Sequence, residues 1–118
     1  MSGLVDYLHD VFRLLGTVRV RRMFGGHGVY LDDLFFALVD DEVLYLKADA
    51  ESAAHFRELG LRQFEYVKEG KAMAMGYYEA PPEVLDDAEQ ARFWGQLAVD
   101  AALRAAQRAA KAAKKRPR

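Results

Sequence analysis

The fold of this chain is decided by residues 22–49, RMFGGHGVYLDDLFFALVDDEVLYLKAD. This stretch contains three apolar runs, residues 29–31, 34–39 and 43–46, which are rich in β-branched, aromatic and leucine side chains. Short acidic groups separate the runs, and such breaks are typical of turns between strands. Because these turns are too short to contain crossover helices, neighbouring strands must run antiparallel. The sequence therefore predicts an antiparallel meander.

The N-terminal side of the meander predicts one helix and one more strand. Residues 3–15 carry apolar side chains at helical spacing, with Ser2 at the N-cap position and Gly16 at the C-terminal cap. Residues 17–24 begin with alternating valines and arginines, which indicates a strand with one solvent-exposed face. The helix must pack on the sheet, because two layers are the smallest arrangement that buries its apolar stripe.

The C-terminal side predicts a short helix, a second hairpin and a long helix. Asp49 is expected to cap the short helix, and Gly60 to end it. The second hairpin comprises residues 63–67 and 72–78, and the proline pair at 81–82 stops the sheet because proline donates no ladder hydrogen bond. The last helix should begin near Asp86, where a pattern similar to a capping box occurs.

The predicted fold class is therefore α+β, a two-layer arrangement with an antiparallel sheet. The element order is one helix, three or four strands, a helix, two strands and a helix. Residues 34–39 are apolar on both faces, which predicts an interior strand with helices on one side. Its other side would be covered by a partner or by the long C-terminal helix, and this suggests a homodimer.

Composition limits the classes of function. A chain of 118 residues without cysteine forms one domain with a single core, and it has no disulfide, thiolate metal site or cysteine nucleophile. Two serines and one threonine leave few places for a hydroxyl nucleophile. No long apolar segment reads as a signal peptide or a membrane span, so we expect a cytoplasmic protein without membrane contact.

Charge divides the chain into an acidic body and a basic tail. All 18 acidic residues lie at or before Asp100, whereas seven basic residues lie beyond it without any acid. These seven are candidate nucleic-acid-binding residues: Arg104, Arg108, Lys111, Lys114, Lys115, Arg116 and Arg118. Five of them recur at intervals of four and three, so in a helix they form one basic stripe that could lie across phosphates. The alternative is a solvated helix end whose cations complement the helix dipole.

Two other motifs are candidate sites of chemistry. Gly25, Gly26 and Gly28 could cradle a phosphate only if they opened a helix, but a strand pattern follows them, which favours a tight hairpin or a bulge. His27 with nearby carboxylates is a possible enzymatic or metal site, yet no histidine pair has metal-ligand spacing. The acidic groups at residues 32–33 and 40–42 lack the pattern of a calcium loop. We therefore predict no catalytic, metal or cofactor site.

A set of residues spread over the body carries a family resemblance. The set comprises Arg22, Met23, Phe24, Gly25, Gly26, Gly28 and Tyr30; residues 36–39 and 44–49, including Lys47 and Asp49; and Phe64, Tyr66, Met75, Tyr77, Tyr78, Glu79, Pro81 and Trp94. Over residues 1 to about 103 this pattern resembles the N-terminal domain of the TfoX/Sxy family. The resemblance implies an α+β fold similar to those of secretion chaperones. It transfers no catalytic residue, and the glycines are carried over only as structural positions.

The resemblance also implies a function. Members with this domain include regulators of natural competence, which act with the cyclic-AMP receptor protein at certain promoters. Those regulators have two domains in series, whereas here residues 1–103 form the expected domain and residues 104–118 an alanine-, lysine- and arginine-rich extension. We therefore expect a stand-alone, non-catalytic domain that regulates competence or transcription through a protein partner, such as a transcription regulator. The alternatives are direct DNA binding by the basic tail and an enzyme with a site near His27.

Overall fold

Three two-residue turns shape the sheet of this protein, whose computed structural model describes residues 3–23 and 25–115. Both central residues have positive φ in each turn, at residues 32–33, 41–42 and 69–70. This is the backbone of the type I′ turn, which matches the twist of antiparallel strands. The acidic groups therefore form tight hairpins, as predicted. The predictions for Ser2, Phe24, Arg116 and Arg118 lie outside the described residues.

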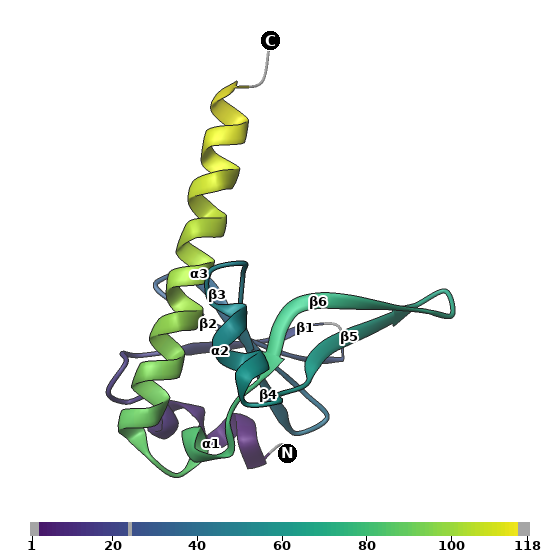
Figure 1. Cartoon of the computed structure of the whole chain (residues 1–118). Coiled ribbons are helices and arrows are strands. Elements are labelled where there is room, and N and C mark those ends of the chain that lie inside the picture. The colour runs from purple at the N-terminus through teal and green to yellow at the C-terminus, as the bar shows by residue number, and fades with distance from the viewer. Residues whose placement is uncertain (1–2, 24, 116–118) are drawn as a thin grey trace.

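The strands form one six-stranded, fully antiparallel sheet in the order β1-β2-β3-β4-β6-β5. Their bounds are β1 Arg19–Met23, β2 Gly26–Leu31, β3 Leu34–Asp40, β4 Val43–Lys47, β5 Gln63–Lys68 and β6 Lys71–Glu79. The predicted meander is confirmed as β1 to β4. After β4 the chain passes to the far edge of the sheet, and β6 returns to pair with β4. The hairpin of β5 and β6 extends away from the body (Figure 1).

The first helix is shorter than predicted. α1 spans Gly3–Val11 rather than residues 3–15. After it the chain tightens into turns, in which Arg13 N donates to the Asp10 carbonyl at 3.3 Å and Leu15 N donates to the Phe12 carbonyl at 2.9 Å. Such three-residue spacing is common where the last turn of a helix tightens. The tightened segment keeps Phe12 fully buried in the core.

The second helix ends where the sequence indicates, but its N-cap is Ser52, and Asp49 caps the turn before it. α2 spans Ala53–Glu58, and the turn before it is closed by Asp49, whose carbonyl accepts from Ala53 N at 2.8 Å. Its end is a Schellman motif, in which Gly60 N donates to the Arg57 carbonyl and the next amide donates to the Phe56 carbonyl. Gly60 has φ +69°, a conformation that glycine adopts without a side-chain penalty. The prediction that Gly60 ends this helix is confirmed.

The last helix starts slightly later than predicted. A short 3₁₀ helix, η1, spans Pro82–Leu85, and α3 spans Ala88–Lys115. Asp87, not Asp86, is its cap, because Asp87 Oδ1 accepts from the amides of Glu89 and Gln90. With 28 residues α3 is about 42 Å long. Figure 1 shows its C-terminal half projecting beyond the sheet, and residues 106–114 are all exposed.

All three α-helices cover the same face of the sheet. Phe12, in the turn after α1, meets Phe36 of β3 edge-on at 5.4 Å, while Phe56 of α2 stacks on Tyr78 of β6 and touches Trp94 of α3. The last helix therefore lies with the others and does not cover the second face. In the described part of the chain, the second face of the sheet carries no helix.

A β-bulge decides which side chains reach the uncovered face. Val29 pairs with Ala37 but Tyr30 pairs with Phe35, so Phe36 is an extra residue on β3. Consequently Phe36 and Ala37 are both fully buried in the core, whereas Phe35 and Leu38 lie on the opposite face. The bulge allows an entirely apolar strand to supply both faces of the sheet.

Candidate functional site

The uncovered face of the sheet contains a groove of about 750 Å³. Its walls come from the start of β2 on one side and from β5 on the other. The lining residues are Met23, Gly26, His27, Phe35, Leu38, Val39, Asp40, Lys47, Phe64, Glu65, Tyr66, Val67 and Tyr77. This volume lies in the range of ligand-binding clefts, and the mixture of an apolar wall with few polar groups is typical of them. We call this feature the open-face groove.

Aromatic rings build the floor of the open-face groove and its surroundings. Tyr30 stacks on Phe35 at 5.1 Å between ring centroids, and Phe35 contacts Tyr77 at 5.6 Å. On the next strands Tyr45 contacts Phe64 at 4.8 Å. Because each ring is held by another, these side chains form a preformed apolar surface. Tyr66 and Val67 remain exposed at its edge, at 42% and 65%.

One cation lies on this aromatic surface. Lys47 Nζ is 4.9 Å from the centroid of the Tyr77 ring, a cation–π geometry. Burial lowers the pKa of Lys47, with Asp49 acting against the shift and Arg108 adding to it. Burial also raises the pKa of Tyr77 to about 12, so its hydroxyl stays protonated. The groove therefore offers an ammonium group and a neutral phenol against apolar walls.

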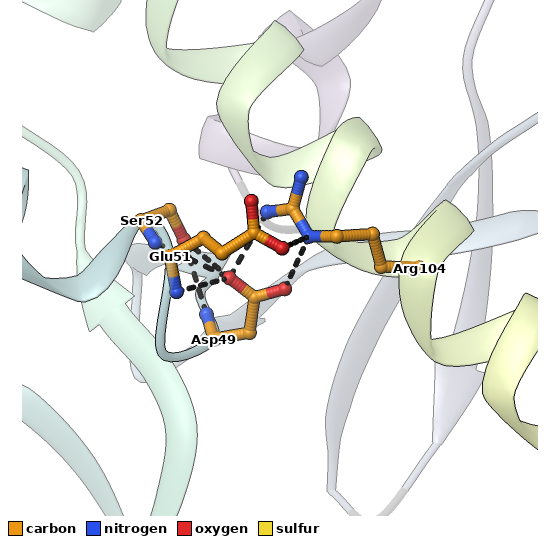
Figure 2. Close-up of polar contacts among 4 residues, drawn as sticks. All are labelled: Asp49, Glu51, Ser52 and Arg104. Carbon is orange, nitrogen blue, oxygen red and sulfur yellow. Dashed lines mark hydrogen bonds and ion pairs between the residues drawn. The ribbon is translucent and has the colours of Figure 1, made fainter.

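A second polar cluster joins the turn before α2 to α3 and is shown in Figure 2. Arg104 of α3 donates from Nε to Asp49 Oδ2 at 2.7 Å and from Nη2 to Asp49 Oδ1 at 3.0 Å. Its Nε also lies 3.2 Å from Glu51 Oε2. The bond from Arg104 is the main reason that the pKa of Asp49 falls to about 2. This bidentate pair ties the long helix to the end of β4.

Asp49 also organises the chain that follows it. Its Oδ1 accepts from the amides of Glu51 and Ser52, while Asp49 N donates to Ser52 Oγ at 3.0 Å. This reciprocal arrangement has the form of a capping box. The Asp49 carboxylate thus caps a turn and pairs with a distant arginine, which identifies a structural role for this residue of the family pattern.

The structure divides the predicted basic stripe. Arg104 is held by Asp49 and Glu51, so its guanidinium is engaged within the domain. Arg108, Lys111 and Lys114 lie on the projecting part of α3, and the two lysines are exposed. Lys115 ends α3, while Arg116 and Arg118 lie outside the described residues. Nucleic-acid binding by this stripe stays a prediction.

The histidines and glycines show no assembled chemistry. His9 and His55 are exposed and His27 lines the groove, and the described residues contain no group of three metal-binding side chains. Gly25 has φ +78° in the turn between β1 and β2, whereas Gly26 and Gly28 belong to β2. The glycine-rich segment therefore leads into a strand, consistent with the hairpin interpretation.

Several residues of the family pattern that are far apart in the sequence lie close together in the folded chain. Met23, Gly26, Lys47 and Tyr77 all line the open-face groove, and a Cβ at Gly28 would lie 3.1 Å from the Phe35 ring. In contrast, Tyr78, Pro81 and Trp94 are buried on the helix side or beneath it. Phe35 and Leu38 also line the groove, although no sequence motif marked them as site residues. Their signals in the sequence were the apolar character of both faces of residues 34–39 and, for Leu38, the family pattern at residues 36–39.

The observations define a small α+β domain whose sheet is covered by helices on one face and presents an aromatic groove on the other. None of the helices in the described residues is long and apolar enough to cross a membrane. A family profile described as the TfoX N-terminal domain matches residues 10–102. The chain belongs to this family, which confirms the resemblance and the predicted fold.

Two curated relatives share the same region. The chain is 35% identical over 79 residues to the DNA transformation protein TfoX1 of Aliivibrio fischeri (strain ATCC 700601 / ES114), covering 67% of this chain and 38% of that protein. It is 30% identical over 90 residues to the protein Sxy of Escherichia coli (strain K12), covering 76% of this chain and 43% of that protein. The chain thus spans about two fifths of the length of these relatives.

Proposed function

We propose that this protein is a non-catalytic regulatory domain that acts in DNA transformation by binding a protein partner through the open-face groove. The observation that carries this proposal is the one-sided sheet. Helices cover one face, while Phe35, Leu38 and Phe64 line a groove on the other. Preformed apolar surfaces with exposed aromatic side chains are typical of interaction sites.

The link to transformation comes from the relatives. One of them is named a DNA transformation protein. The family profile matches residues 10–102, which include the strands that build the groove. A transcription regulator is the partner class that the family resemblance favours. A second copy of the chain on the same face is the competing partner.

Transformation frequency in the source cell tests this proposal. The gene is deleted and complemented with the wild type, with Leu38→Glu in the groove, or with Leu59→Glu on the helix side, where Leu59 is 56% exposed. We expect deletion and Leu38→Glu to lower the frequency at least tenfold, and Leu59→Glu to restore it. Circular dichroism of both variants checks that they fold. An unchanged frequency in the deletion strain would contradict the proposal.

Photo-crosslinking identifies the partner in the same cells. A photoreactive phenylalanine analogue replaces Leu38, and the matched control places it at Leu59. We expect a crosslinked product only at position 38. A product of twice the chain mass would identify a homodimer, whereas a different mass would identify another protein.

Direct DNA binding is a second candidate, favoured by the projecting helix. Every residue of 106–114 is exposed, including Lys111 and Lys114, so a phosphate backbone could reach this part of the stripe. Because Arg104 is held by Asp49 and Glu51, six basic residues remain to contact phosphates. If all six were engaged, the logarithm of affinity should fall with the logarithm of salt concentration with a slope of about −5. A salt titration on random duplex DNA compares the full chain with one that ends at residue 106. Equal binding by the two chains would exclude the stripe.

A further inference from the structure

Lys47 is an unusual residue in the open-face groove. Its ammonium group lies over the Tyr77 ring, and burial lowers its pKa. Among the described residues, no carboxylate oxygen lies within 4.0 Å of Lys47 Nζ. The ion pairs at this distance all join other residues. A partly buried charge without an ionic partner costs free energy in the absence of ligand. A bound ligand that places a carboxylate beside Lys47 would offset this cost.

The other charged residues of the groove lie elsewhere. Asp40 pairs with Val43, at the start of β4, whereas Lys47 is at its end and pairs with Tyr77. Glu65 lies on β5, where it pairs with Ala74 of β6. The lining residues therefore include two carboxylates, and Lys47 is the one lysine or arginine among them. Asp49 is bonded by Arg104 and attracts Lys47 only from beyond ion-pair distance, while Arg108 repels it.

We propose that the open-face groove binds an extended acidic segment of a protein partner, with one carboxylate of that segment paired to Lys47 and a neighbouring apolar side chain packed on Phe35 and Leu38. This proposal rests on the proposed function, because it assumes that the groove binds protein. A carboxylate supplies the charge that Lys47 lacks, and the Tyr77 hydroxyl, kept protonated, is a donor to the same group.

The shape of the groove favours a peptide segment as its occupant. The groove is open to solvent along the sheet, and its lining comes from all six strands, with four residues each from β3 and β5. Alternate side chains of an extended segment are spaced to fill successive apolar positions along such a surface. The positive charge of Lys47 then selects for one acidic position beside the apolar ones.

Peptide selection tests this inference without knowledge of the partner. A phage library of random 12-residue peptides is selected on the full chain. Each enriched peptide is then synthesised in two versions, one with its acidic residues and one in which Asp is replaced by Asn and Glu by Gln. Binding is measured by fluorescence polarisation to the wild type, Lys47→Met, Lys47→Arg and Lys114→Met. Lys114 is an exposed lysine on the projecting helix and serves as the matched control.

The expected result is a set of peptides that share an acidic residue next to an aromatic or aliphatic one. Lys47→Met and the acid-to-amide peptide should each weaken binding at least tenfold. Lys114→Met should change it less than twofold, and Lys47→Arg should restore part of the affinity. Failure to enrich such peptides, or equal binding by Lys47→Met, would overturn the inference.

The two proposals fail in different ways. An unchanged transformation frequency after gene deletion contradicts the proposed function but leaves peptide binding in vitro intact. If the Leu38 variant loses transformation but peptides bind equally well with and without Lys47, only the inference about Lys47 is contradicted. Crosslinks at position 38 that capture a partner without an acidic segment at the contact would do the same.

Discussion

Replacing Asp49 by Asn should separate the ion pair with Arg104 from the turn that Asp49 caps. The asparagine side chain keeps an oxygen that can accept the bonds made by the amides of Glu51 and Ser52. It loses the negative charge that faces the guanidinium at 2.7 Å. The change therefore weakens the link between α3 and the end of β4 without removing the capping geometry.

The structure sets the size of this effect. The pKa of Asp49 falls from 3.8 to about 2, which corresponds to about 2–3 kcal/mol at about 1.4 kcal/mol per pKa unit. Arg104 remains 28% exposed and Asp49 12%, and solvent screening reduces the contribution. We expect Asp49→Asn to lower the free energy of unfolding by about 1.5 kcal/mol. The midpoint of thermal unfolding should fall by about 6 °C.

The pH dependence has a definite sign. The pKa of Asp49 is lower in the folded state than in the unfolded state, so its stabilisation is complete above the unfolded value near 4. It is lost as the pH falls through the folded value of about 2. The difference in stability between the wild type and Asp49→Asn should therefore be constant at neutral pH and shrink between pH 4 and 2.

A double-mutant cycle with urea denaturation measures the pair directly. Asp49→Asn, Arg104→Gln and the double variant are compared, and we expect a coupling free energy of about 1 kcal/mol. The control is Arg92→Gln, which removes the exposed pair of Arg92 with Glu89 and should cost less than about 0.5 kcal/mol. A coupling below about 0.3 kcal/mol would refute the role assigned to this pair.

Three further outcomes are expected. A chain ending at Leu103 lacks Arg104 and should lose about 1.5 kcal/mol in urea denaturation, whereas one ending three residues later should match the full chain. Gly26→Ala would press its Cβ against the carbonyl oxygen of Val39, so it should cost on the order of 2–3 kcal/mol by the same method; a smaller loss would contradict the close approach of β2 and β3. Lys47→Met should be at least as stable as the wild type at pH 7, because it removes a charge whose pKa burial lowers. That advantage should shrink as the pH rises towards 10.5, the ordinary pKa of lysine, and a clear loss of stability at pH 7 would argue against the cost assigned to Lys47.

Local sequence signals predicted most of the elements. Short acidic groups between apolar runs indicated the turns of the meander, and Gly60 marked the end of α2, because each of these features depends on a few neighbouring residues. The end of α1 and the cap of α3 were displaced by a few residues. Such boundaries depend on which backbone amide finds a partner, and pattern alone determines that poorly.

The features that create the candidate site were not local. The bulge at Phe36 is a matter of register between β2 and β3, and a run that is apolar on both faces gives no sign of where the register shifts. The pairing of β6 with β4 joins segments on either side of α2. Likewise, Arg104 resembled every other member of a basic stripe until folding brought it to Asp49.

The sheet is joined across its middle by a short seam. β4 and β6 pair through Tyr45 with Glu79, Leu46 with Tyr78 and Lys47 with Tyr77, and these partners are distant in sequence. The hairpins on either side form between neighbouring residues. The seam forms later, because the chain between β4 and β6 must first close into a long loop. Because Lys47 and Tyr77 are themselves seam partners, the groove exists only after this late step. A ligand that bridges them would slow the opening of the seam, and protection of its amides from hydrogen exchange would report occupancy.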